Sequence, residues 1–325
     1  MDRLTFIATL GGGLLVASRA AVAQPASKLW RIGFVGGSSN IPGAYTDAFR
    51  AGLGELGFAV GQNVSIEYRW LGDPLSPAPE VVADFVRSLV DVIVASGSPA
   101  VLSAKEATKS IPIVMVGARD PVEQGIITSL ARPGGNVTGI SASAGPAIAS
   151  KRLSLIKQAV PRASHVGHLW SSMFPGAKPH ADEMVRAGDR MKITVSSFDV
   201  SGPDELTNTF AAMKRQGVDV VSVEAALTAY RKRIVEIAAA SRLPAFYGIS
   251  SFVEQGGLMS YSADWIEIFR KAGGYAGKIL KGARPSDLPV EQPTRFELVV
   301  NLRAAKAIGL TIAPSLLLQA DRVIE

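Results

Sequence analysis

The chain has 325 residues, a formal net charge of +6, 47% hydrophobic residues and no cysteine. This length is sufficient for two α/β domains, each with its own core. The lack of cysteine excludes disulfides, Cys-ligated zinc and thiol catalysis. Lys and Arg are spread along the chain and form no basic block, so we expect no nucleic-acid partner.

The first 23 residues are typical of a secretory signal peptide. Arg3 supplies the basic start, Leu4–Ala17 is apolar, and Ala21-Val22-Ala23 has the small-residue pattern of a cleavage site. The apolar run is shorter than the roughly 20 residues that a membrane-spanning helix needs. We therefore expect cleavage after Ala23 and a periplasmic protein, with a retained membrane anchor as the alternative.

A first series of alternating strands and helices follows. Trp30–Gly36 has the pattern of a buried strand, and the polar loop after it contains Ser38 and Ser39. Apolar residues at helical spacing predict an amphipathic helix over Tyr45–Leu56. The next elements expected are a strand over Asn63–Trp70, a helix over Glu80–Leu89 and, further on, a short helix over Gly125–Ala131.

One unit of the chain occurs twice. Val90–Gly117 contains an apolar strand, the loop Ser96-Gly97-Ser98-Pro99, a helix-like segment and a second apolar strand. Val218–Gly248 has the same order, also starts Val-Asp-Val, and has Glu224 at its loop. Two copies roughly 130 residues apart indicate a duplicated half.

The second half repeats the order of the first. Its expected helices and strands are Lys151–Ala159, Val166–Trp170, Ala181–Met191, Ile193–Phe198 and Glu205–Gln216. The remaining residues do not repeat, and they contain a strand over Leu258–Ser262, a helix over Trp265–Leu280, an extended run over Pro289–Asn301 and a helix over Leu302–Ile308. We expect these pieces to cross between the halves and to form a hinge of several strands.

The predicted fold class is α/β, with two doubly wound, Rossmann-like lobes and a multi-strand hinge. In such sheets ligands bind outside the carboxyl ends of the strands, and a cleft between lobes is a preferred pocket. The candidate ligand contacts are therefore the residues at predicted strand ends: Ser38, Ser39, Gly97, Ser98, Asp120, Trp170, Ser171, Glu224, Tyr247 and Tyr261.

The chemistry of these residues suits a small organic solute. The donors that suit a carboxylate are the hydroxyls of Ser38, Ser39, Ser98 and Ser171, whereas Asp120 or Glu224 suits an ammonium group. The aromatic candidates suit stacking on a planar or apolar group. The alternatives are helix capping for Ser98, a turn for Asp120, solvation for Glu224, ordinary packing for Trp170 and Tyr261, and an anion held by Arg119.

The two repeated loops differ in chemistry. Ser96-Gly97-Ser98-Pro99 offers hydroxyls and a helix N-terminus, which suit an anion. Glu224-Ala225 offers a carboxylate, which suits a cation or a hydroxyl. We expect the two loops to face each other across the cleft and to favour a ligand with two unlike ends.

Several motifs resemble those of one family. They are Val90–Gly117, Asp120-Pro121-Val122, Arg132–Gly139, Gly256–Tyr261 and Leu288–Asn301. Over essentially all of the mature chain, the sequence resembles ABC transporter substrate-binding proteins of the tryptophan/tyrosine-binding type, which have the type 1 periplasmic binding fold. The resemblance implies a receptor that traps a small solute between two lobes and presents the closed form to a membrane permease.

The family has three crossings between its lobes. Carried onto this sequence, they fall near 139–143, 257–260 and 284–290, so that 28–141 plus 260–286 form the first lobe and 142–259 plus 287–325 the second. Ser141, at the first crossing, joins the candidate ligand contacts. Amino-acid binders of the family commonly carry Asp after Gly-Val-Ser here, whereas Ala142 follows Ser141 in this chain. The loop Trp170-Ser171-Ser172 and Glu224 also depart from the Asn-Pro and Asp that are frequent at those places.

The predicted function is an extracytoplasmic solute-binding receptor of an ABC importer for an amino acid or related small organic acid. We expect a monomer that works with an inner-membrane permease and needs no cofactor or metal. A ligand-sensing input protein for a membrane receptor is the first alternative, and an exported hydrolase is the second. The sequence contains no Gly-x-Ser-x-Gly elbow, no Gly-x-Gly-x-x-Gly after the first strand and no Walker A motif, so we expect no enzyme.

Overall fold

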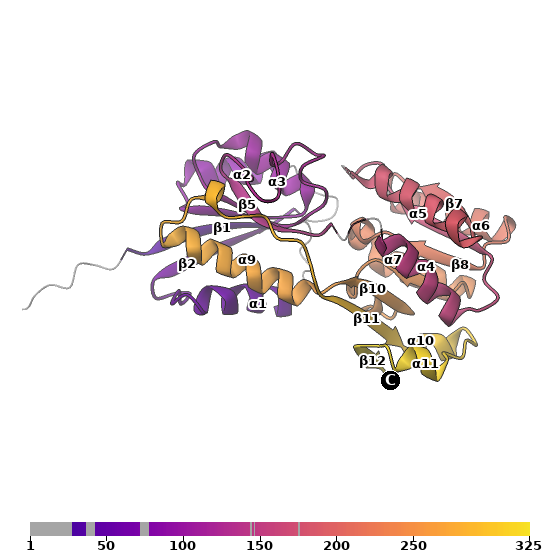
Figure 1. Cartoon of the computed structure of the whole chain (residues 1–325). Coiled ribbons are helices and arrows are strands. Elements are labelled where there is room, and N and C mark those ends of the chain that lie inside the picture. Colours follow the sequence, from indigo (N-terminus) through magenta and orange to yellow (C-terminus); the bar gives the residue numbers. More distant parts are fainter. Residues whose placement is uncertain (1–27, 37–42, 72–77, 144, 146, 175) are drawn as a thin grey trace, which may run out of the picture.

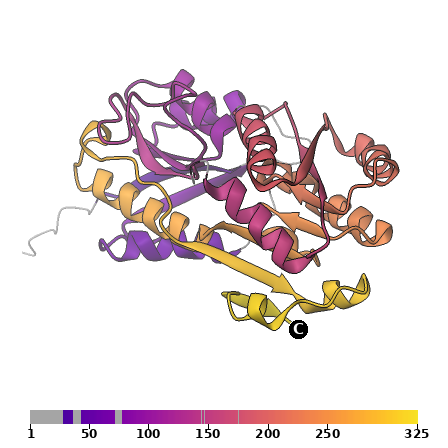
Figure 2. The same cartoon turned by 45° about the vertical axis from the view of Figure 1, so that its right-hand side comes forward.

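The computed structural model describes residues 28–36, 43–71, 78–143, 145, 147–174 and 176–325. Two α/β lobes lie side by side, and segments of the C-terminal part of the chain run between them (Figures 1 and 2). The expected signal peptide, residues 1–23, and the candidates Ser38 and Ser39 lie outside the described residues.

The first lobe contains a five-stranded sheet of order β2-β1-β3-β4-β5, in which all neighbours are parallel. Its elements are β1 (Trp30–Gly36), α1 (Gly43–Gly54), β2 (Val64–Trp70), α2 (Ala78–Arg87), β3 (Val92–Ser96), α3 (Ser98–Ala107), β4 (Ile113–Ala118) and β5 (Val137–Ser141). Successive strand residues point to opposite faces, so Phe34 packs with α1 whereas Val35 packs with α2 and α3. The strands are therefore buried on both sides.

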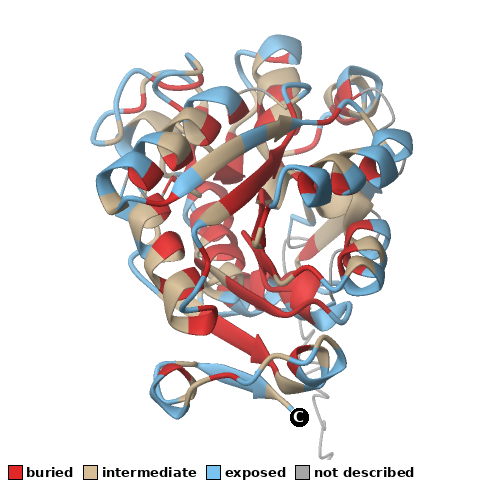
Figure 3. Cartoon of the chain, turned by 90° about the vertical axis from the view of Figure 1, so that its right-hand side faces the viewer, coloured by how far each residue is buried: buried red, intermediate tan, exposed pale blue. Residues whose placement is uncertain are grey.

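The second lobe contains a seven-stranded sheet of order β12-β11-β10-β9-β8-β6-β7. Its strands are β6 (His165–Trp170), β7 (Thr194–Asp199), β8 (Val220–Val223), β9 (Ala245–Tyr247), β10 (Met259–Ala263), β11 (Phe296–Asn301) and β12 (Arg322–Ile324). Its helices are α4 (Ala147–Ala159), α5 (Ala177–Met191), α6 (Leu206–Arg215), α7 (Arg231–Ser241), α8 (Ser251–Glu254), α10 (Leu302–Ala307) and α11 (Pro314–Leu317). Figure 3 shows buried strands in the middle of the lobe between helices whose outer faces are exposed.

The predicted fold class and the duplicated unit are confirmed. Val90–Gly117 forms β3, α3 and β4, and Val218–Gly248 forms β8, α7 and β9. The order β2-β1-β3-β4 in the first sheet matches β7-β6-β8-β9 in the second. Each copy therefore holds the same place in its sheet, and the loops after β3 and β8 leave equivalent strand ends.

The prediction of a short helix over Gly125–Ala131 is wrong. The chain forms turns there, with Gly125 at φ 65°, and the amides of Ile126 and Ile127 both donate to the carbonyl of Pro121. This turn buries the two isoleucines in the core of the first lobe. Apolar residues that enter a core from a loop can have helical spacing without forming a helix.

Two of the expected crossings are displaced along the chain. β10 pairs with β9 at Met259 and Ser260 and with β11 as far as Ala263, so residues 260–263 belong to the second lobe. Glu291 forms a bridge with Ile140, and Val290 packs in the first lobe, so residues 287–291 belong there. In both places backbone pairing continues beyond the residue at which the sequence motifs place the crossing. The chain passes to the other lobe only where this pairing ends.

The long helix α9 (Trp265–Leu280) packs on the first lobe, as the sequence resemblance implies. Asp264 caps it by accepting a hydrogen bond from the amide of Glu267. Glycines permit its close contact with α1: a methyl group at Gly273 would overlap the carbonyl oxygen of Phe49. Figures 1 and 2 both show α9 beside α1. The packing of α9 fixes the position of Trp265 at its first turn.

Replacing Gly273 by Ala should lower the free energy of unfolding by about 1–3 kcal/mol, because the added methyl group forces α1 and α9 apart. Gly274→Ala is the matched control: nothing lies within 4 Å of its added methyl group. It should raise stability by about 0.5–1 kcal/mol through helix propensity alone. Urea unfolding followed by circular dichroism measures both. Equal effects of the two substitutions would contradict the close packing.

Candidate ligand-binding site

A cavity of about 270 Å³ lies between the two lobes. The loop after β3 contributes Gly97 and Ser98, and the loop after β8 contributes Glu224 and Ala225. The expectation that these two loops face each other across a cleft is confirmed. Because the strands of both sheets end there, the cavity occupies the place where doubly wound sheets bind ligands.

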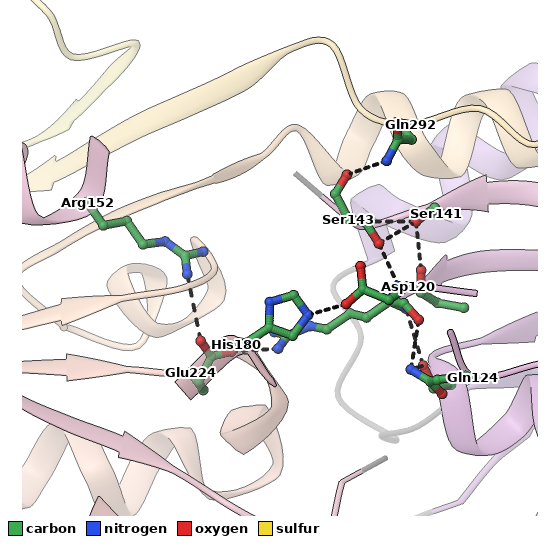
Figure 4. A network of polar contacts seen from close by, with 11 residues as sticks. Asp120, Gln124, Ser141, Ser143, Arg152, His180, Glu224 and Gln292 are labelled. Carbon is green, nitrogen blue, oxygen red and sulfur yellow. Dashed lines mark hydrogen bonds and ion pairs between the residues drawn. The ribbon is translucent and has the colours of Figure 1, made fainter. Parts of the chain in front are cut away.

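A buried group of charges joins the lobes on one side of the cavity (Figure 4). Nη1 of Arg119, which follows β4, lies 2.6 Å from Oε2 of Glu224, which follows β8. Nη1 of Arg152 on α4 lies 3.9 Å from Oε1 of the same carboxylate. Arg152 also donates to the carbonyls of Tyr261 and Gly248, at 3.1 and 3.3 Å. Glu224 therefore has a guanidinium group from each lobe beside it.

The electrostatic environment keeps Glu224 ionised. Its side chain is only 4% exposed, and burial by itself would raise the pKa of its carboxyl group. The opposing positive charges of Arg119 and Arg152 instead hold that pKa well below its ordinary value. A buried carboxylate of this kind is costly without its partners, so the position of Arg119 depends on Glu224 and the reverse.

His168 lies beneath this group on β6 and is completely buried. Its Nε2 is 3.6 Å from Oε1 of Glu224, and its Nδ1 is 3.3 Å from the hydroxyl of Ser222. Burial lowers the pKa of His168 to about 4, although the charge of Glu224 acts in the opposite direction. At neutral pH the imidazole is therefore neutral.

A second contact crosses the cleft at Asp120. Its Oδ2 lies 2.6 Å from Nε2 of His180 on α5 of the second lobe. The backbone of Asp120 has φ 37°, and its amide donates to the hydroxyl of Ser143 at 2.6 Å. The hydrogen bond with His180 is the main reason that the pKa of Asp120 lies below its ordinary value. With two such contacts between them, the lobes are closed on each other.

Ser98 supports the loop that carries Arg119. Its hydroxyl oxygen accepts hydrogen bonds from the amide of Arg119 and from Nε2 of Gln124, both at 3.2 Å. It does not cap α3, whose N-cap is Gly97 with φ 83°. The side chain is buried at the edge of the cavity. Ser98 therefore connects the loop after β3 to the loop that carries Arg119, and it does not act as a helix cap.

Aromatic side chains form another part of the lining. The ring of Tyr45 on α1 stacks on Phe269 of α9 at a centroid distance of 5.1 Å, and Trp265 follows at 6.3 Å. Gly117 has φ 72°, and a Cβ atom there would overlap the indole of Trp265. The glycine thus lets the indole lie against the end of β4, and the ring system gives the cavity an apolar surface.

The structure brings only some of the predicted contacts to the cavity. Gly97, Ser98 and Glu224 line it, and Asp120 adjoins it through its contact with the lining residue His180. Ser141, Trp170, Ser171, Tyr247 and Tyr261 are not among its lining residues.

The remaining candidates have other partners. Ser141 donates to the carbonyl of Ala118 at 3.0 Å, and Ser171 accepts from the amide of Met173 at 3.3 Å. The indole of Trp170 donates to the hydroxyl of Ser197 at 2.6 Å. Tyr247 stacks on Phe252, and Tyr261 stacks on Phe296. These side chains support the second lobe and the first crossing.

Sequence reasoning missed the lining residues that lie on helices. Arg152, His180, Tyr45, Trp265 and Phe269 have the helical spacing of ordinary surface or core positions. Of the charged lining residues that were not among the candidate contacts, only Arg119 was considered from the sequence, as a residue that could hold an anion. The available signal was the position of Arg152 in α4. It lies three and four residues from the buried Ala149 and Ile156, on the apolar face of the helix, where an arginine is rare.

The buried His168 predicts an acid-sensitive stability. The unfolded chain takes up this proton near pH 6.5, whereas the folded protein takes it up only near 4. The stability is therefore fully present above pH 6.5 and is lost as the pH falls toward 4, by up to about 3 kcal/mol. In urea titrations, His168→Gln should flatten this dependence, whereas His165→Gln at the half-buried start of β6 should retain it. An unchanged slope in His168→Gln would rule out His168 as the cause.

Comparisons with known proteins agree with this architecture. A family model described as ABC transporter substrate binding protein matches residues 41–324. A tyrosine-binding protein of Clostridioides difficile is 26% identical over 81% of this chain and 75% of its own length. The crystal structure of an ABC domain in complex with L-Trp from Streptococcus pneumonia is 28% identical, with 91% and 100% of the two chains covered and a TM-score of 0.82. A ligand-free, open substrate-binding protein of Clostridium difficile is 24% identical, covers 91% and 99%, and has a TM-score of 0.68.

Proposed function

Because the chain belongs to the ABC transporter substrate-binding protein family, we propose that it is the extracytoplasmic receptor of an ABC importer. It traps an amino acid or a related small organic acid between its lobes. The observation that carries this proposal is the closed cavity, which both lobes line and which charged side chains border. The names of the relatives that bind tyrosine and L-Trp support a ligand of this size.

Lobe closure is the proposed mechanism. A ligand in the cavity contacts both lobes, so its affinity is higher for the closed form, and this difference shifts the population toward closure. The hinge consists of the three crossings that follow β5, follow β10 and precede β11. Opening separates Arg119 from Glu224 and Asp120 from His180, and closure restores both contacts. The protein acts by binding, without catalysis, and the closed form is the form that a permease recognises.

Gly97, Ser98 and Arg119 are the ligand contacts that this proposal favours, because they line the cavity, whereas Glu224 on its other side is already paired with Arg119. Asp120 is better explained as a closing contact than as a ligand contact. Ser38 and Ser39 stay predictions.

The proposed location is the periplasm, with cleavage of residues 1–23 after Ala23 and an inner-membrane permease as partner. Among the residues that the structure describes, none of the helices combines the length and the hydropathy of a membrane span. We propose that the mature receptor is a monomer. Mass spectrometry of the exported protein would give its N-terminus, which we expect at Gln24.

A thermal-shift screen of the purified mature protein against amino acids, aromatic acids and other small organic acids tests the receptor role. A ligand present at 100 times its Kd stabilises the folded state by about 2.7 kcal/mol, so the melting temperature should rise by several degrees. A sugar series is the matched control, and it should leave the melting temperature unchanged. Turnover of an ester or amide substrate without any such shift would refute the receptor role.

Asp120→Asn should shift the ligand-free protein toward an open form, because it removes the charge that faces His180. For a partly exposed pair we expect a change of about two- to fivefold in the ratio of open to closed molecules. Small-angle X-ray scattering should then give a larger radius of gyration. Asp47→Asn is the control, since Asp47 pairs with Arg50 on the same helix. An unchanged radius of gyration in Asp120→Asn would show that the pair does not hold the lobes together.

A further inference from the structure

The charged groups that line the cavity are not balanced. Two guanidinium groups, of Arg119 and Arg152, face one carboxylate, that of Glu224. The nearby carboxylate of Asp120 is held by His180 at 2.6 Å and does not line the cavity. In the described lining, Glu224 is thus the only carboxylate, and both of its oxygens already face arginine.

The uncommitted polar groups at the same place are donors. Of the nitrogen atoms of the Arg119 guanidinium, only Nη1 is bonded to another described residue, and its side chain is 20% exposed. The oxygen of Ser98 accepts two hydrogen bonds, so its own hydrogen is left to donate. A guanidinium group and a hydroxyl donor at the same place in the cavity suit an anion. A carboxylate fits the planar fork of Arg119.

Among the described residues that line the cavity, no unpaired carboxylate faces an ammonium group. The only carboxylate in the described lining is Glu224, and its charge is already offset by Arg119 at 2.6 Å and Arg152 at 3.9 Å, so a further cation would face an excess of positive charge. A carboxylate, by contrast, binds the free nitrogen atoms of Arg119 without disturbing Glu224. Ala142, which lines the cavity near Trp265 and Gly117, offers only a methyl group. A buried charge without a partner is strongly unfavourable.

We propose that the ligand is an aromatic or similarly apolar monocarboxylate that lacks an amino group. Its carboxylate binds Arg119 and the hydroxyl of Ser98, and its apolar body lies against Tyr45, Phe269 and Trp265. This inference rests on the receptor function proposed above and specifies its substrate class. It separates the chain from relatives whose names give tyrosine or L-Trp as the ligand.

Isothermal titration of the mature protein with matched solutes tests the proposal. The pairs are 3-(indol-3-yl)propanoate against L-tryptophan and 3-phenylpropanoate against L-phenylalanine, with 3-phenylpropanamide as the uncharged control. The acids should bind about 100-fold or more tightly than the amino acids, which corresponds to one unpaired buried charge. The amide should bind as weakly as the amino acids, because it gives Arg119 no anion.

Two sets of variants locate the selectivity. Ala142→Asp should weaken binding of the acids at least tenfold and improve binding of the amino acids, because it places a carboxylate in the cavity. Ala142→Asn has the same size without the charge, and it should not improve binding of the amino acids. Arg119→Gln should abolish binding of the acids and Ser98→Ala should weaken it about tenfold. Arg69→Gln, at a surface pair with Glu67, should leave binding unchanged. Thermal melts show whether each variant is folded.

Binding of the amino acids that equals or exceeds binding of the acids would overturn this inference and leave the receptor function intact. The same holds if only a solute of another class binds and closes the lobes. If no solute in the wider screen binds or closes the lobes, the receptor function fails as well. The outcomes of the two proposals are therefore distinguishable.

Discussion

The contact between Arg119 and Glu224 is the interaction on which the closed form depends. It joins the end of β4 in the first sheet to the end of β8 in the second. Because Glu224 is almost completely buried, its ionised form is stabilised by the cations beside it, and Arg119 of the other lobe contributes most. In this arrangement each of the two groups offsets the cost of burying the other.

The groups around this pair follow from the same constraint. Arg152 is held by two backbone carbonyls, which leave its remaining nitrogen directed at Glu224. His168 stays neutral because burial outweighs the attraction of the carboxylate, so it adds no charge to the group. An apolar wall then lies beside an excess of positive charge. Among the described residues, that combination favours a ligand that has an anionic group and an apolar body.

The aromatic wall shows how the hinge and the site are connected. Trp265 begins α9, directly after the crossing that follows β10, and α9 is fixed to α1 by contacts that only glycine permits. The indole is therefore placed by the packing of the first lobe, although its chain has just left the sheet of the second. A change in the position of that crossing would move the wall of the cavity. The position of the hinge crossing and the shape of the cavity are therefore connected through α9.

Much of the fold could be predicted from the sequence, because strands buried on both faces have local, continuous apolar patterns. Trp30–Gly36 and Trp265–Leu280 were predicted with the bounds that the structure has. The turn after Pro121 could not be predicted, since Ile126 and Ile127 have helical spacing to Leu130 but enter the core from a loop. At the site, Ser98 and Glu224 could be found as strand-end residues of the repeated unit, whereas Tyr247 and Tyr261 occupy similar places and pack elsewhere.

By itself, the sequence determined the two-lobed α/β fold, the duplication, and the opposition of a hydroxyl-bearing loop to the Glu224 loop. These depend on local patterns and on the rule that parallel strands end at one edge. Only the tertiary structure decided which charges meet and which aromatic rings line the cavity. Arg119, Arg152, Glu224 and His168 come from four separate elements, and Tyr45 and Trp265 lie more than 200 residues apart. Their proximity is a result of chain folding, and the electrostatics that select a ligand exist only once they are together.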